Sequence, residues 1–199
     1  MKGYIIILLL LSNILKSQYF NYSVKEEYDL FNEQEVNNSY NPCLVPPNGD
    51  QGTFGDHIFP ILESYVTMFK TTKDKAYLYK FVKEAICVIE NRHDYSGINN
   101  EPRWATSMYH DGNIVAALSR FVYLIKIEEP SLKNELIYQF EEFKPSNYVP
   151  NTCNCNKFGI TFNTFGQFAD WVQGRVGETA YWFINNGYTL FFSGMNFIR

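Results

Sequence analysis

The chain has 199 residues and a formal net charge of −4, from 17 basic and 21 acidic side chains. Because binding to nucleic-acid phosphates needs a concentrated basic surface and the sequence has none, a nucleic-acid partner is not expected. The length suffices for one domain with a genuine hydrophobic core. Aromatic residues make up 18% of the chain, which suits surfaces that meet sugars or proteins, although an AT-rich genome would give the same bias.

The first 17 residues have the layout of a secretory signal peptide. Lys2 supplies a positive start, an apolar run covers residues 4–14, and the segment ends at the small residue Ser17. A membrane-spanning helix needs about 20 apolar residues, so the short run favours a cleaved signal over an anchor. We therefore expect removal of residues 1–17 and a secreted or extracytoplasmic protein with no membrane association afterwards.

Two further regions follow the signal. Residues 18–54 show no sustained hydrophobic period and are punctuated by asparagine, proline and glycine, which predicts an extended arm. Residues 55–199 predict a mainly α domain built from antiparallel helical hairpins. Its last helix has no predicted partner after it, as in a domain truncated at the C-terminus.

The first two helices are predicted from apolar residues at helical spacing. Pro60 fits the first turn of the first helix, and a capping box at residues 71–74, with Thr71 as the cap and Asp74 three residues on, starts the second. So short a connection forces the helices to run antiparallel, so residues 56–93 predict an αα-hairpin. The two apolar stripes are Ile61, Leu62, Tyr65, Met68 and Phe69, then Leu78, Phe81, Val82, Ala85, Val88 and Ile89.

Three more helices are predicted downstream. Asp111 would cap the third, and Pro130 would open the fourth, which continues to Phe143 and completes a second hairpin. A fifth helix begins at Thr164 and stops at the Asn-Asn-Gly sequence of residues 185–187. Its apolar stripe is Phe168, Val172, Val176, Ala180 and Phe183, with Trp171, Arg175, Glu178 and Trp182 largely off that stripe.

Four cysteines, Cys43, Cys87, Cys153 and Cys155, leave two disulfides or free thiols as alternatives. An even count in an exported protein allows two bridges and three pairings. Cys153 and Cys155 are too close in sequence to bridge easily to each other. Their Cys-x-Cys spacing does not match common structural zinc sites, and no histidine is nearby. No metal or other cofactor is therefore assigned.

Antiparallel packing of the first hairpin would bring its two histidine-containing ends together. Asp56 and His57 lie at one end of its sequence, and His93 and Asp94 lie at the other. Such a group resembles a small metal cluster, but histidines beside capping acids at helix ends are more often structural. We therefore do not expect a metal there.

The main candidate site is the loop after the first hairpin together with the start of the third helix. Tyr109, His110 and Asp111 are the candidate catalytic residues, because a polysaccharide lyase needs a His or Tyr base and a glycosidase needs paired acid and base groups. Alternatively, Asp111 only caps the helix and His110 is a half-buried neighbour. The candidate substrate-binding residues are Arg103, which would neutralise a uronate, Trp104, which would stack on a sugar ring, and Glu101, Trp171 and Trp182.

The sequence FKTTKDKAYLYKFVKEA at residues 69–85 resembles the hairpin repeat of six-hairpin, or (α/α)-toroid, carbohydrate-active proteins. Trp104, followed by Tyr-His-Asp-Gly at the opening of a helix, is similar to the polar helix starts around the central cleft of such toroids. The resemblance covers residues 56–143 and implies a glycoside hydrolase or polysaccharide lyase with a carbohydrate partner. A full toroid needs about six hairpins of helical-repeat length. This chain holds about two and a half, so we expect a partial toroid or a compact helical array.

Three functions are compatible with these features. An exported protein acting on polysaccharide should gather Trp104, His110 and either Trp171 or Trp182 around a cleft. A non-catalytic secreted binding or scaffold module should display aromatic residues on an open face without a convergent acid and base. A truncated, inactive remnant of a toroid enzyme should expose an apolar helix face where the next hairpin would pack. The substrate and the oligomeric state do not follow from the sequence.

Overall fold

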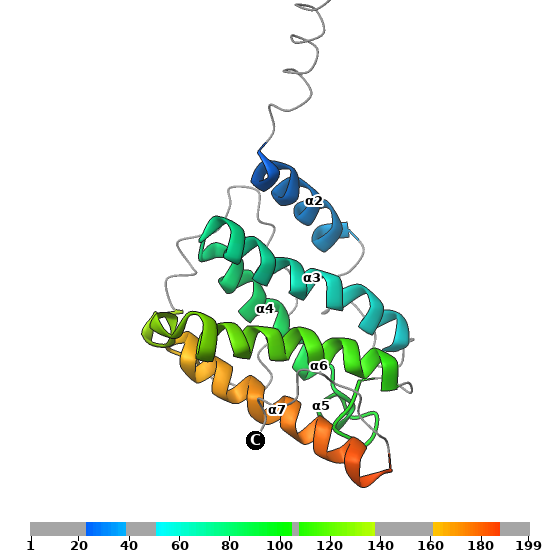
Figure 1. Ribbon diagram of the computed structural model, residues 1–199. Coiled ribbons are helices and arrows are strands. Elements are labelled where there is room, and N and C mark those ends of the chain that lie inside the picture. The colour runs from blue at the N-terminus through cyan, green and yellow to red at the C-terminus, as the bar shows by residue number, and fades with distance from the viewer. Residues whose placement is uncertain (1–22, 39–50, 105–107, 138–160, 188–199) are drawn as a thin grey trace, which may run out of the picture. The chain divides into compact units, whose positions relative to one another are not determined.

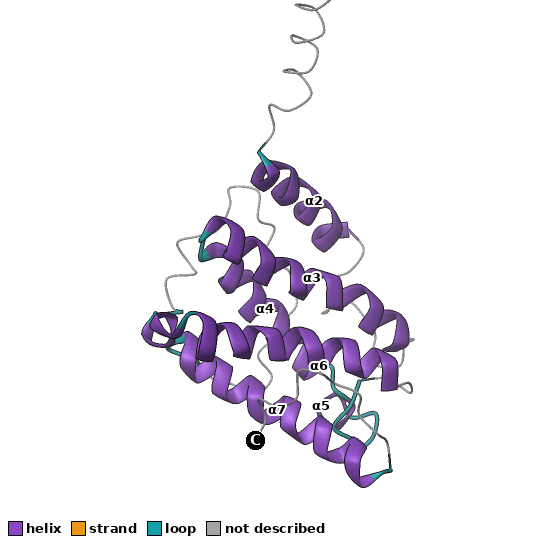
Figure 2. Cartoon of the chain, in the orientation of Figure 1, coloured by secondary structure: helices purple, strands orange, loops and turns teal. Residues whose placement is uncertain are grey.

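The computed structural model describes residues 23–38, 51–104, 108–137 and 161–187 (Figure 1). Over these residues the chain consists of helices joined by loops and turns (Figure 2). One isolated bridge pairs Leu136 with Thr164. The mainly α prediction is therefore confirmed. Several sequence predictions fall outside the described residues: the predicted signal peptide at residues 1–17, the end of the predicted fourth helix at Phe143, and any pairing of Cys43, Cys153 and Cys155. Among the described helices, none combines the length and the apolar character that crossing a membrane requires.

The chain divides into two compact units, residues 1–39 and 40–199. In the first unit, residues 24–38, expected to be part of an extended arm, form helix α2 (Val24–Asn38). A capping box starts this helix: the Ser23 hydroxyl accepts from the Glu26 N–H at 3.2 Å, and the Glu26 carboxylate accepts from the Ser23 N–H at 3.0 Å. These bonds lower the pKa of Glu26. The capping box therefore fixes where helix α2 begins. Among the side chains described in this helix there is no continuous buried apolar stripe, and its apolar residues Leu30 and Phe31 are exposed.

In the second unit, helix α3 (Gln51–Thr72) and helix α4 (Ala76–Glu90) form the predicted αα-hairpin. Helix α3 starts earlier than expected, so Pro60 lies inside it instead of in its first turn. Thr71 also belongs to α3, where its hydroxyl donates to the Thr67 carbonyl, and it does not cap α4. The chain leaves α3 through Lys73 at φ 58°, and the Asp74 carboxylate accepts from the Ala76 N–H at 3.0 Å. Asp74 thus supplies a hydrogen-bond acceptor for a backbone N–H in the first turn of α4.

Helix α4 lies at the centre of this unit, and all of its residues are buried or half-buried. The Phe81 ring stacks on Phe121 with centroids 4.4 Å apart, and Tyr79 packs against Phe165 at 5.2 Å. Residues of α4 outside the predicted apolar stripe are also covered, because Glu84 is 4% exposed and Cys87 is 2% exposed.

Cys87 is disulfide-bonded. The alternative of a free thiol therefore does not hold at Cys87. The other three cysteines of the chain, Cys43, Cys153 and Cys155, lie outside the described residues.

After α4 the chain forms the short helix α5 (His93–Ser96), a loop, and helix α6 (Met108–Tyr123), which continues as the π-helix η1 (Leu124–Glu128). The fourth helix was predicted from Pro130 onwards, but only a 3-10 helix, η2 (Pro130–Asn134), is present there. Backbone hydrogen bonds from Ile137 to Asn163 and from Phe165 to Glu135 hold the following residues in an extended bridge. The prediction of a second α-helical hairpin was therefore wrong over these residues.

Helix α7 (Phe165–Asn185) matches the predicted fifth helix. Thr164 caps it by accepting from the Gln167 N–H at 3.2 Å. Its apolar stripe packs on α6, where Phe168 meets Phe121 edge to face at 5.5 Å. The first turn of α7 and the 3-10 helix η2 approach so closely that a Cβ on Gly166 would lie 2.7 Å from the Lys133 carbonyl oxygen.

Candidate functional site

The three candidate catalytic residues all lie in the first turn of α6. Successive residues of an α-helix point about 100° apart, so neighbours face different surroundings. Tyr109 is 67% exposed, His110 is half-buried and Asp111 is completely buried. The structure therefore does not direct these three side chains at one common point.

Asp111 and Trp104 hold each other inside the fold. One carboxylate oxygen of Asp111 accepts from the Trp104 backbone N–H at 2.6 Å, so Asp111 binds the backbone of the preceding loop and is not the N-cap of α6. The Trp104 indole is fully buried, and its Nε1 donates to the Val88 carbonyl of α4 at 2.5 Å. Trp104 therefore presents no face to a sugar, contrary to expectation. It anchors the loop on the central helix instead.

His110 connects the start of α6 to the start of α3. Its Nε2 lies 3.4 Å from the Asp56 carboxylate, and its Nδ1 is buried without a hydrogen-bond partner within the described part of the chain. A general base must offer a nitrogen to the substrate, directly or through one water. The two nitrogens of His110 instead face Asp56 and the interior. Asp56, which the sequence placed near His93, is thus a partner of His110.

Gly55 permits the close approach of these two helices. A Cβ at this position would lie 2.8 Å from the His110 Cβ and 2.9 Å from its carbonyl oxygen. Neither atom can move without shifting the backbone of α6. The glycine was not singled out from the sequence, because the need for it comes from a helix more than 50 residues later.

Substituting Gly55 with alanine should separate the two helices. We expect Gly55→Ala to lower the free energy of unfolding by about 1–3 kcal/mol, as overpacking does. Gly174→Ala is the matched control: this glycine also lies in a helix, but a Cβ there would meet nothing within 4 Å. It should stabilise the protein by about 0.5–1 kcal/mol through helix propensity. Urea unfolding of both variants measures the difference, and equal effects would show that the approach of the helices is not tight.

Arg103, Glu101 and Trp182 lie together and contact one another. The Arg103 Nε lies 2.7 Å from the Glu101 carboxylate, and its guanidinium lies over the Trp182 ring at 4.7 Å. The Arg103 charge is therefore balanced by Glu101, and one face of the Trp182 indole is occupied. Because the Arg103 charge is already paired, this arrangement does not favour binding of uronate carboxylates.

Trp171 is separate from this group. It packs against Phe162 and Phe168 with ring centroids 5.0 and 5.8 Å apart. It precedes Trp182 by eleven residues on the same helix, which corresponds to about 16 Å along the axis. The two tryptophans therefore do not form a single stacking platform.

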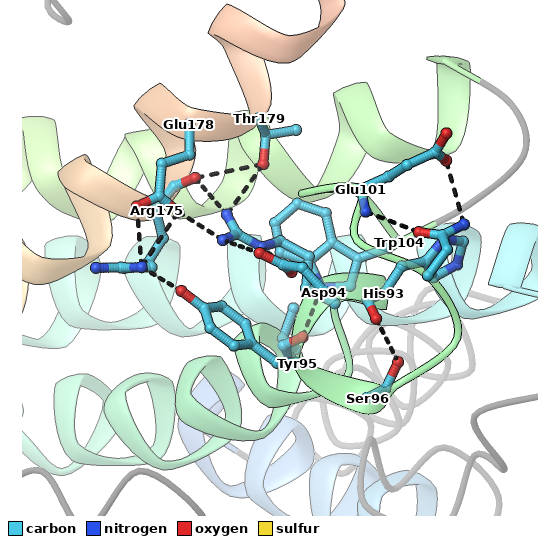
Figure 3. A network of polar contacts seen from close by, with 12 residues as sticks. His93, Asp94, Tyr95, Ser96, Glu101, Trp104, Arg175, Glu178 and Thr179 are labelled. Carbon is cyan, nitrogen blue, oxygen red and sulfur yellow. Dashed lines mark hydrogen bonds and ion pairs between the residues drawn. The ribbon is translucent and has the colours of Figure 1, made fainter.

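A polar cluster that was not predicted as a unit centres on Arg92. Figure 3 shows its partners Asp94, Arg175 and Glu178. Arg92 is 0% exposed and binds both carboxylate oxygens of Asp94 at 2.8 Å, the Glu178 carboxylate at 2.5 Å and the Arg175 carbonyl at 2.7 Å. Its guanidinium lies 4.8 Å from the Tyr95 ring centroid. Burial alone would lower the pKa of Arg92, but the hydrogen bonds to Asp94 and Glu178 outweigh it and raise that pKa. The cluster joins the α4–α5 turn to α7, and every nitrogen of the Arg92 guanidinium donates to a group of the protein itself.

The acids at the two ends of the hairpin contact other side chains. Asp56 contacts His110, and Asp94 contacts Arg92. Over the described ranges, no three side chains of the His, Cys, Asp and Glu types gather closely enough to hold an ion.

Comparison with known proteins gives no match, whether to a family model, to a curated protein or to a solved structure. The resemblance to (α/α)-toroid proteins therefore stays a prediction.

Proposed function

We propose that this chain is an exported, non-catalytic helical module that binds neutral polysaccharide through Tyr109, His110 and Asp56. We call these three residues the Tyr109 surface. The observation that carries the proposal is a tyrosine, Tyr109, that is 67% exposed and packs against His110. His110 in turn contacts the Asp56 carboxylate, whose side chain is 50% exposed, across the starts of α6 and α3. Export rests on the signal-like residues 1–17.

The chemistry of the Tyr109 surface suits an uncharged sugar. An exposed phenol ring offers a flat apolar face and a polar tip, as the C–H face and hydroxyls of a pyranose require. His110 lies edge-on to it, with centroids 5.3 Å apart and an interplanar angle of 74°, which limits the motion of the ring. The Asp56 carboxylate accepts hydrogen bonds from hydroxyls but repels another carboxylate. Neutral glycans are therefore favoured over uronates, all the more because Arg103 is paired with Glu101.

Binding is favoured over catalysis because the acid and base groups do not converge. His110 has one nitrogen directed at Asp56 and the other in the interior. Asp111 is completely buried and bound to the Trp104 backbone. Either mechanism considered from the sequence would need one of these groups to reach the sugar.

The test is binding of Tyr109→Ala to insoluble neutral polysaccharides such as cellulose, xylan and chitin, with pectate as the uronate probe. Tyr181→Ala is the matched control, because Tyr181 on α7 is 68% exposed, nearly the same as Tyr109. We expect Tyr109→Ala to bind at least about tenfold more weakly, which corresponds to a lost contact of about 1.4 kcal/mol. Tyr181→Ala should bind like the wild type, and no sugar should be released.

Three results would overturn the proposal. An equal loss in both tyrosine variants would place the binding surface elsewhere. Stronger binding to pectate than to the neutral polymers would contradict the role of Asp56. New reducing ends or unsaturated uronates in the supernatant would show that the protein is an enzyme.

A further inference from the structure

Two backbone hydrogen bonds close the loop of residues 93–104, which precedes α6. The His93 N–H donates to the Arg103 carbonyl at 2.8 Å, and the Asp94 N–H donates to the Glu101 carbonyl at 3.2 Å. The loop then ends at Trp104, whose backbone N–H binds Asp111. The position of the first turn of α6 is thus linked to the closed state of the loop.

The His93 side chain lies inside this closed loop. It is 4% exposed, and neither ring nitrogen makes a hydrogen bond within the described part of the chain (Figure 3 shows its surroundings). The charged groups that act on it are Arg103 and Glu101 from the loop and Asp94 from α5. Burial and the Arg103 charge lower the pKa of His93, and the Trp104 backbone and the two carboxylates oppose them without reversing the direction.

We propose that His93 makes the Tyr109 surface sensitive to acid, because a proton on the buried imidazole opens the loop and releases Trp104 from Asp111. An imidazolium needs hydrogen-bond acceptors or water, and neither ring nitrogen has a hydrogen-bond partner within the described residues. The Trp104 backbone favours the charged form, but burial and the Arg103 charge outweigh it. It would also be repelled by the neighbouring guanidinium. Opening the loop hydrates the charge but removes the contact that fixes the first turn of α6, where Tyr109 lies.

The expected pH dependence follows from linkage. A histidine whose pKa is lower in the closed loop than in the open loop favours closure above its ordinary pKa of about 6.5. This contribution is lost as the pH falls below that value, because the open loop then binds the proton more readily. The inference of weaker glycan binding in acid rests on the proposed function, whereas the opening of the loop does not.

The test follows amide hydrogen exchange in the full mature protein between pH 7.5 and 5.0. In the wild type, protection factors at His93, Asp94 and Trp104 should fall by up to about tenfold for each pH unit below about 6.5. His93→Gln, which carries no proton at any of these values, should give a flat profile. His57→Gln is the control for loss of an unrelated histidine and should respond like the wild type.

Glycan binding measured in parallel separates the two proposals. Acid-weakened binding in the wild type, absent in His93→Gln, supports both. Loop opening with no glycan bound at any pH removes the proposed function but not the switch. Protection that is independent of pH, or that falls equally in His93→Gln, overturns the switch. If His93→Gln does not fold, an NMR titration of His93 in the wild type decides the matter, and a pKa at or above the ordinary value overturns the switch.

Discussion

Arg92→Met is expected to lower the free energy of unfolding by about 3–5 kcal/mol, the range observed when one partner of a buried charged network is removed. Arg92 is completely buried and connects the turn after α4 to α7 through Asp94, Glu178 and the Arg175 carbonyl. Methionine fills similar apolar space but donates no hydrogen bond. Because Asp94 and Glu178 are 22% and 41% exposed, water can hydrate them in part, so the lower half of the range is favoured.

The matched control for this prediction is Arg120→Met. Arg120 is 48% exposed and lies 3.2 Å from the Glu63 carboxylate, so it also forms an ion pair, but near solvent. Exposed pairs contribute about 0–1 kcal/mol, and this loss should be correspondingly small. Urea unfolding monitored by circular dichroism compares the two variants. A loss of less than about 1 kcal/mol for Arg92→Met would show that the network does not hold α7.

Glu84→Gln should change how stability depends on pH. Glu84 is 4% exposed, and burial raises its pKa from 4.5 to about 7, with Lys83 and Lys80 acting in the opposite direction. The folded protein therefore holds this proton more tightly than the unfolded chain does. The protonated Glu84 carboxyl therefore contributes fully to stability below about pH 4.5. As the pH rises, the free energy of unfolding declines, by about 3 kcal/mol in total once pH 7 is passed.

Glutamine is neutral at every pH and removes this decline. The stability of Glu84→Gln relative to the wild type should rise by about 3 kcal/mol between pH 4 and pH 8. Glu135→Gln is the control, because the Glu135 side chain is 44% exposed. Chemical unfolding at several pH values gives the comparison. A constant difference between Glu84→Gln and the wild type would mean that the Glu84 carboxyl is solvated in the folded protein.

Much of the fold follows from local patterns in the sequence. The apolar stripes of α4 and α7 are properties of short windows, and the structure contains them as predicted. The cap of α2 was also present in the sequence, but its weak apolar period hid it. The failure after Pro130 has a different cause, because the extended bridge there depends on a pairing partner near Asn163.

The candidate site was harder to predict because its residues are used for packing. Trp104 and Asp111 have the side chains that a sugar site needs, yet both bind backbone atoms inside the fold. Arg92 gave little signal, because its partners on α7 lie more than 80 residues away. Side-chain type alone does not distinguish a residue that contacts a ligand from one that stabilises a buried turn.

The most direct test of a non-catalytic Tyr109 surface is a map of chemical-shift changes as a neutral oligosaccharide is added to the wild-type protein. We expect the changes to concentrate at residues 55–57 and 108–111, with no new reducing ends in the same sample. Changes centred on Trp171, or any cleavage of the sugar, would contradict it.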